Sequence, residues 1–181
     1  MQKKEFDQWF RQWKSSNDAY RIVDRYDLQS LAAGACDALA LAIYWSFPKN
    51  VTGLWKIQSV STSRVDHVFA TLRFDGSDRE YGVDMDLGVR PAYGFSERWT
   101  AENFHGQQYS YLTTPWDTLT PIDKPLSVMM SAARELSASM RKSIRRLSSG
   151  LPMSSGAAAM AAAIGAVIGG GAVFALRRDR A

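Results

Sequence analysis

One long uncharged stretch near the C-terminus constrains the chain more than any other feature. Residues 156–176, GAAAMAAAIGAVIGGGAVFAL, contain no charged side chain. About 20 such residues in a helix are enough to cross a hydrocarbon core of roughly 30 Å. We therefore expect a transmembrane helix over 156–176, a basic tail over 177–181, and the folded part of the protein before them.

Small residues dominate this predicted helix and recur on one of its faces. Ala157, Ala161, Gly165 and Gly169 follow one another at intervals of four, a spacing that lets two helix backbones approach closely. The Gly165/Gly169 face thus offers a route to a homo-oligomer. The alternative is a low-complexity tail with no specific partner.

The region before the uncharged stretch divides into three segments. Residues 124–147 place Met129, Leu136 and Met140 at helical spacing and carry the basic run RKSIRR at their end, which indicates an amphipathic basic juxtamembrane helix. Residues 148–155, rich in serine, glycine and proline, are typical of a linker. This leaves residues 1–123 as the predicted folded domain.

The distribution of charge favours a lipid bilayer over nucleic acid as the partner. The net charge is +4, and much of the excess lies in RKSIRR and RRDR, which flank the uncharged segment. No secretory signal pattern opens the chain, and a single cysteine excludes an intrachain disulfide. We expect a membrane protein with one C-terminal anchor, its soluble domain cytoplasmic, and no nucleic-acid partner.

Within residues 1–123, helical patterns precede strand patterns. Phe6, Trp9, Phe10 and Trp13 share one face of an N-terminal helix, an aromatic face that is typical of core packing. A second helix is predicted over 37–47, followed by three strand-like runs, GLWKIQSVS, HVFATLRF and EYGVDMDLGV. Helices followed by antiparallel strands predict an α+β fold.

The only cysteine lies where the second helix begins. A thiolate at a helix N-terminus beside an imidazole is an activated nucleophile, and His67 opens the second strand. If DGSD forms a symmetric turn, Asp86 lies opposite His67 and Asp84 opposite Phe69, so either carboxylate reaches the ring. The alternative for Cys36 is a small buried side chain without chemistry.

These residues resemble the papain-like cysteine hydrolase superfamily, in particular its amidase and transglutaminase-like branches. The similarity is carried by GACDALALAIYWSF, DHVFATLRFDG and YGVDMDLG, in the order Cys, His, Asp. The resemblance implies a helix bearing the cysteine packed on a small antiparallel sheet, with Cys36 as nucleophile, His67 as base and Asp84 as the residue that orients the ring. Gln29 stands one position away from the usual place of the oxyanion-hole glutamine.

The expected function is therefore a membrane-anchored cysteine hydrolase acting on an amide or peptide bond of an unknown protein or peptide substrate. The alternative is a non-catalytic papain-like or α+β interaction module at a membrane, for example a virion or envelope component. We expect no cofactor. We also expect no metal site, because Cys36, His67 and His105 do not have the spacing of metal ligands.

Overall fold

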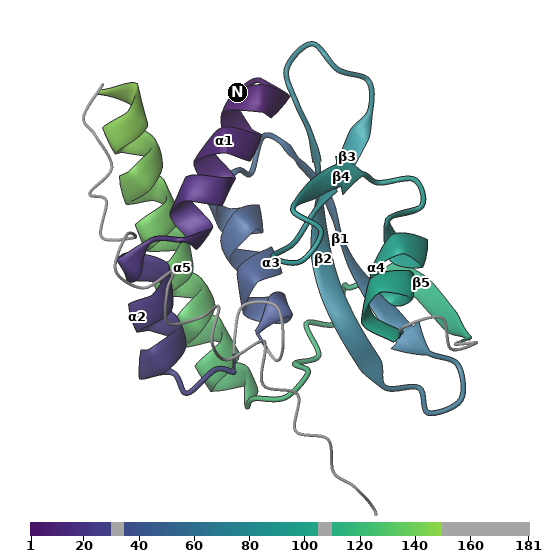
Figure 1. Cartoon of the computed structure of the whole chain (residues 1–181). Helices are drawn as coiled ribbons and strands as arrows, with labels where there is room; N and C mark the ends of the chain where they lie inside the picture. Colours follow the sequence, from purple (N-terminus) through teal and green to yellow (C-terminus); the bar gives the residue numbers. More distant parts are fainter. Residues whose placement is uncertain (30–34, 105–109, 150–181) are drawn as a thin grey trace, which may run out of the picture.

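An antiparallel sheet separates two unequal layers of helices (Figure 1). The computed structural model describes residues 1–29, 35–104 and 110–149. The strands lie in the order β4-β3-β2-β1-β5, and every neighbouring pair is antiparallel. In chain order the elements are α1 (Lys3–Lys14), α2 (Asn17–Arg25), α3 (Cys36–Ser46), β1 (Val51–Ser59), β2 (Val65–Arg73), β3 (Glu80–Val83), β4 (Val89–Pro91), α4 (Phe95–Phe104), β5 (Tyr111–Pro115) and α5 (Leu126–Ser148).

Helix α3 is the centre of the larger layer. Its first eight residues are all buried, and they carry apolar side chains on every side. Such a helix must be covered on more than one face, and α3 lies between the sheet and α5 (Figure 1). On the far side of the sheet, α4 covers a smaller core that contains Ile57, Phe69 and Phe95.

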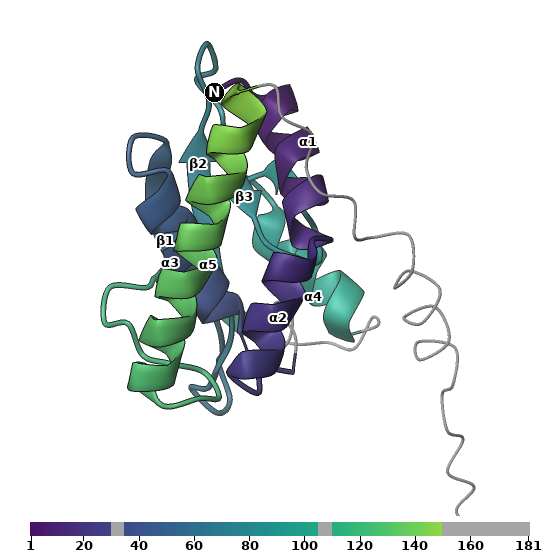
Figure 2. The ribbon, with the colours of Figure 1, turned by 90° about the vertical axis from the view of Figure 1, so that its left-hand side faces the viewer.

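The aromatic face of α1 packs into the larger core, as predicted. Phe6, Trp9, Phe10 and Trp13 are each about 1% exposed. The indole N–H groups donate hydrogen bonds to α5, from Trp9 to Ser143 Oγ at 3.0 Å and from Trp13 to Ser139 Oγ at 3.1 Å. Since the residue numbers rise on one helix as they fall on the other, α1 and α5 run antiparallel (Figure 2).

Helix α5 belongs to the same core. The sequence predicts a folded domain over 1–123 and a separate juxtamembrane helix over 124–147. In the structure, α5 buries Met129, Leu136 and Met140 completely, and it packs along α3. The folded domain therefore extends to Ser148, because without α5 one face of α3 would be exposed to water.

The predicted fold class included a transmembrane helix, and in this respect it is wrong. Within residues 1–29, 35–104 and 110–149, no helix is long and apolar enough to cross a membrane. The 23-residue α5 is long enough, but charged residues such as Arg134, Glu135 and Arg141 interrupt its apolar side chains. The segments 156–176 and 177–181 lie outside the described residues. What the structure has is an α+β fold of five helices and a small five-stranded antiparallel sheet in those ranges.

The predicted register between the second and third strands is confirmed where they pair. Ala70 lies opposite Val83, and Arg73 opposite Glu80. The predicted single run EYGVDMDLGV is instead two strands, because β3 ends at Val83 and the chain turns before β4. Gly88 has a φ of +67° in this turn, and its carbonyl accepts a hydrogen bond from the Asp84 N–H at 3.2 Å.

The place of α5 in the core gives a stability prediction. We expect Leu136→Ala to lower the free energy of unfolding by about 2–5 kcal/mol, because this side chain is fully buried. Leu147→Ala on the same helix removes a side chain that is 42% exposed, and we expect a change of about 0.5 kcal/mol or less. Urea unfolding of both variants measures the difference. Equally small effects would contradict the packing of α5 into the domain.

Candidate functional site

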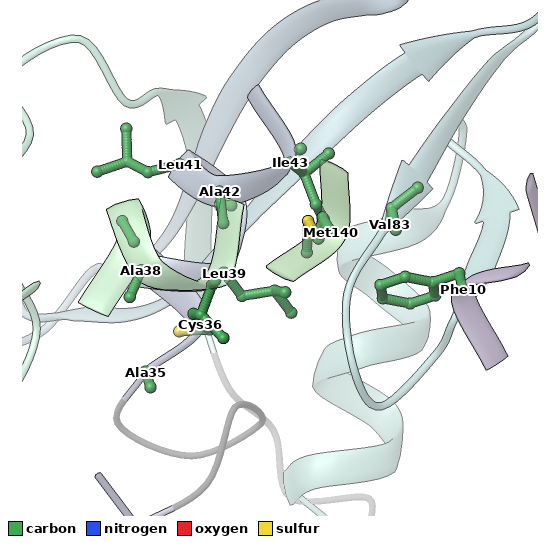
Figure 3. Close-up of a cluster of buried hydrophobic side chains, with 14 of the residues drawn as sticks. Phe10, Ala35, Cys36, Ala38, Leu39, Leu41, Ala42, Ile43, Val83 and Met140 are labelled. Carbon is green, nitrogen blue, oxygen red and sulfur yellow. The ribbon is translucent and has the colours of Figure 1, made fainter. Parts of the chain in front are cut away.

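Cys36 is the first residue of α3. The helix begins directly after Ala35, whose carbonyl accepts the first intrahelical hydrogen bond, from Leu39 N–H at 3.0 Å. The side chain lies among buried apolar groups and Cys36 is only 2% exposed (Figure 3). The unpaired N–H groups of a helix N-terminus carry partial positive charge, and this favours a thiolate at such a position.

His67 and Asp84 form a buried pair. His67 Nε2 lies 2.8 Å from Asp84 Oδ2, and both side chains are 1% exposed. The second carboxylate oxygen, Oδ1, accepts a hydrogen bond from the Leu87 N–H at 2.7 Å. The turn between β3 and β4 therefore fixes the carboxylate, and the carboxylate fixes the ring with Nε2 bearing the proton.

Cys36 is close enough to His67 to change its proton affinity. Burial lowers the pKa of His67, but electrostatic interaction with Cys36 and the hydrogen bond and charge of Asp84 outweigh burial and raise that pKa from 6.5 to about 10. The ring nitrogen that Asp84 does not engage, Nδ1, is buried and has no hydrogen-bond partner among the described residues. The structure therefore brings His67 and Asp84 into direct contact, and Cys36 interacts electrostatically with the imidazole.

The structure distinguishes the two carboxylates that the sequence left open. Asp84 holds the ring directly, whereas Asp86 is exposed and makes no hydrogen bond to the imidazole in the described part of the chain. Burial raises the pKa of Asp86, the charge of Asp84 raises it further, and the charge of His67 lowers it. The charges of Asp84 and His67 thus act on Asp86, but Asp86 does not orient the imidazole.

Trp99 of α4 is a site residue that the sequence analysis missed. Its ring stacks on that of His67, with centroids 4.4 Å apart and planes inclined by 13°. Phe69, two residues along β2, lies 6.4 Å from the imidazole at 15°. Stacking on an indole restricts the ring plane and stabilises a protonated imidazole. Nothing in the local sequence around Trp99 signals this contact, since 32 positions separate it from His67.

A second buried carboxylate follows the cysteine. Asp37 Oδ1 accepts a hydrogen bond from the Ala38 N–H at 2.7 Å, and Oδ2 accepts one from the Ile122 N–H at 3.0 Å. Burial raises its pKa despite these bonds. Asp37 therefore joins the segment before α5 to the first turn of α3, next to the thiol.

The remaining expectations for the site concern Gln29, His105, a metal and a cofactor. Gln29 lies after α2 and lines a polar cavity. His105 lies outside the described residues, and no group of three metal-binding side chains occurs in the part of the chain that is described. The expectations of no metal and no cofactor remain predictions.

The comparisons with known proteins identify no relative of this chain. No family model matches the chain, and no curated protein or solved structure matches it either. The resemblance to papain-like hydrolases therefore remains a prediction, carried by the residues and geometry of this chain alone.

The pair of carboxylates gives a matched test of ring orientation. In Asp84→Asn the amide oxygen still accepts the Leu87 N–H, but the charge beside Nε2 is lost. We expect the pKa of His67, measured by NMR, to fall by about one unit or more. Asp86→Asn is the control and should shift it less. Equal shifts in the two variants would contradict the assignment of Asp84.

The raised pKa of His67 also predicts a pH dependence of stability. A group whose pKa is higher in the folded state stabilises the fold fully below its unfolded pKa and loses that contribution as the pH rises through the folded pKa. Compared with His67→Gln, the wild-type advantage in unfolding free energy should be largest below pH 6.5 and should decline as the pH approaches about 10. Urea titrations of both proteins measure it. An advantage that grows with pH would contradict the assigned direction.

Proposed function

We propose that this protein is a cysteine hydrolase that cleaves an amide or peptide bond, with the chemistry of the papain-like enzymes it resembles. The single observation that carries the proposal is the buried 2.8 Å pair of His67 and Asp84, next to the thiol of Cys36 at the start of a helix. A nucleophile, a base and a residue that orients the base are the three parts that acyl transfer requires.

In the first half of the reaction, the Cys36 sulfur attacks the carbonyl carbon and the C–N bond breaks. The protonated His67 donates its proton from Nδ1 to the leaving nitrogen, which departs as an amine. The acyl group remains on the sulfur as a thioester. Asp84 stays ionised and holds Nε2 throughout, so that Nδ1 points consistently at the reacting atoms.

In the second half, the now neutral His67 takes a proton from water, and the hydroxide oxygen attacks the thioester carbonyl. The C–S bond breaks, the carboxylic acid leaves, and the site returns to a thiolate beside a protonated imidazole. The Cys36 N–H at the start of α3 is the oxyanion donor that this geometry supports, because the Ala38 N–H already donates to Asp37 and the Leu39 N–H to Ala35.

A second candidate function is favoured by one observation, the burial of Cys36. At 2% exposure its sulfur does not meet a large substrate without a local opening. A non-catalytic α+β interaction module would keep the Cys36, His67 and Asp84 cluster for stability alone. Such a module would tolerate Cys36→Ser and His67→Ala in a functional assay, which a hydrolase would not.

The single cysteine makes the proposal straightforward to test, because every thiol modification reports on Cys36. We expect iodoacetamide to alkylate the native protein faster than the same protein in urea, since the activated thiolate more than compensates for burial. We expect His67→Gln to abolish this excess. Hydrolysis of a panel of fluorogenic peptide amides should fall at least about a hundredfold in Cys36→Ala and in His67→Gln.

The control is Asp86→Asn, which leaves all three proposed catalytic residues in place. Slower alkylation of the native than of the unfolded protein, together with no hydrolysis above the Cys36→Ala background, would contradict the hydrolase and favour the interaction module.

A further inference from the structure

A polar cavity lies on the surface of the described residues. It has a volume of about 510 Å³, within the range of pockets that hold small ligands. Its lining comes from three separate segments, and it comprises Asp27, Gln29, Arg64, Asp123 and Lys124. The lining is dominated by charged groups, so the cavity is suited to a polar ligand.

Two connections link the lining of this cavity to neighbours of the proposed catalytic residues, none of which lines it. Asp37, the neighbour of Cys36, accepts the Ile122 N–H, and Asp123 and Lys124 follow Ile122 directly. Arg64 stands immediately before β2, three positions from His67, and its guanidinium lies 3.9 Å from Asp66 and 3.6 Å from Asp123. The lining is therefore linked to the first turn of α3 through the Asp37–Ile122 hydrogen bond and to the start of β2 through Arg64.

The lining of the cavity carries two positive and two negative side chains, which form weak ion pairs with one another. Lys124 Nζ lies 3.0 Å from Asp27 Oδ2, while the Arg64 guanidinium and the Asp123 carboxylate are 3.6 Å apart. The side chain of Asp27 is almost fully exposed. Exposed ion pairs of this kind are each worth about 0–1 kcal/mol. A ligand that brings its own charges can replace them at little cost.

We propose that this cavity binds the charged ends of a short peptide whose termini are free. An α-ammonium group fits beside the carboxylates of Asp27 and Asp123, and an α-carboxylate fits beside Arg64 and Lys124. Gln29 supplies an amide that both donates to and accepts from a peptide bond. This inference rests on the proposed hydrolase, for which it names the substrate class: small peptides rather than folded proteins.

Other ligand chemistries fit the lining less well. A phosphate or other polyanion would be repelled by the two carboxylates of the lining. A polyamine would be repelled by its two cations. An acyl chain would bury charged groups without replacing their partners, which is costly. A zwitterion alone satisfies both signs at once.

Binding is measured without turnover in Cys36→Ala, full-length, by isothermal titration with a defined pool of dipeptides. Three forms of the pool are compared: free termini, N-acetylated, and C-amidated. We expect the free form to bind with a Kd below about 10 mM. Each blocked form should bind at least about tenfold more weakly, because one charge of the cavity then loses its counterpart.

Variants of the lining connect the binding to the cavity. Arg64→Gln and Asp123→Asn keep similar shapes and remove one charge of each sign, and each should weaken the free pool at least about tenfold. Arg79→Gln, an exposed arginine at the β2–β3 turn, is the matched control and should leave binding unchanged. Equal binding of free and blocked forms, or no binding by any form, would overturn the proposal.

The same experiment distinguishes failure of the proposed dipeptide binding from failure of the proposed hydrolase. If Cys36→Ala binds free dipeptides and the wild type hydrolyses none of them, the cavity stands and the hydrolase fails. If the wild type hydrolyses blocked and free peptides with equal KM, the hydrolase stands and the cavity assignment fails. If both hold, Arg64→Gln should raise KM and leave kcat close to the wild-type value.

Discussion

The rest of the structure depends on the burial of α3 on every side. An 11-residue helix with apolar side chains around its whole circumference cannot lie on a surface, so it needs the sheet on one side and other helices on the other. Helix α5 supplies that second cover, and α1 packs its aromatic face against both α5 and the core. As a consequence, the N-terminus of α3 is held in place, and with it Cys36.

The buried His67 and Asp84 pair is costly for the same fold. Removing two charges from water costs several kcal/mol for each ion, and the pair recovers this only with further hydrogen bonds. Asp84 receives one from Leu87, and His67 gains the stacked ring of Trp99 and the charge of Cys36. Apolar side chains of similar size would fill this space at lower cost. A cluster of charged side chains buried in the core is typical of a functional site.

Much of this arrangement could be predicted from sequence because it depends on local rules. The register of β2 and β3 is the one that a symmetric DGSD turn predicts, and it brings the Asp84 region beside His67. The turn that forms is closed by a hydrogen bond from the Ser77 N–H to the Phe74 carbonyl. The aromatic face of α1 follows from helical periodicity. The break after Val83 was missed, because a positive φ at Gly88 depends on the course of the chain rather than on the residues beside it. Trp99 and the polar cavity were missed because distant segments build them.

The end of β3 explains how Cys36 and His67 meet although they belong to different layers. His67 shares its face of the sheet with Phe69 and packs toward α4, whereas Cys36 lies in the core on the α3 side. Because β3 pairs only with residues 70–73, the first half of β2 has a strand on one side only within the described ranges. At this open edge, the Asp84–Gly88 turn and the start of α3 both approach the imidazole. Shortening one strand thus leaves space beside His67 in which the Asp84–Gly88 turn reaches the imidazole.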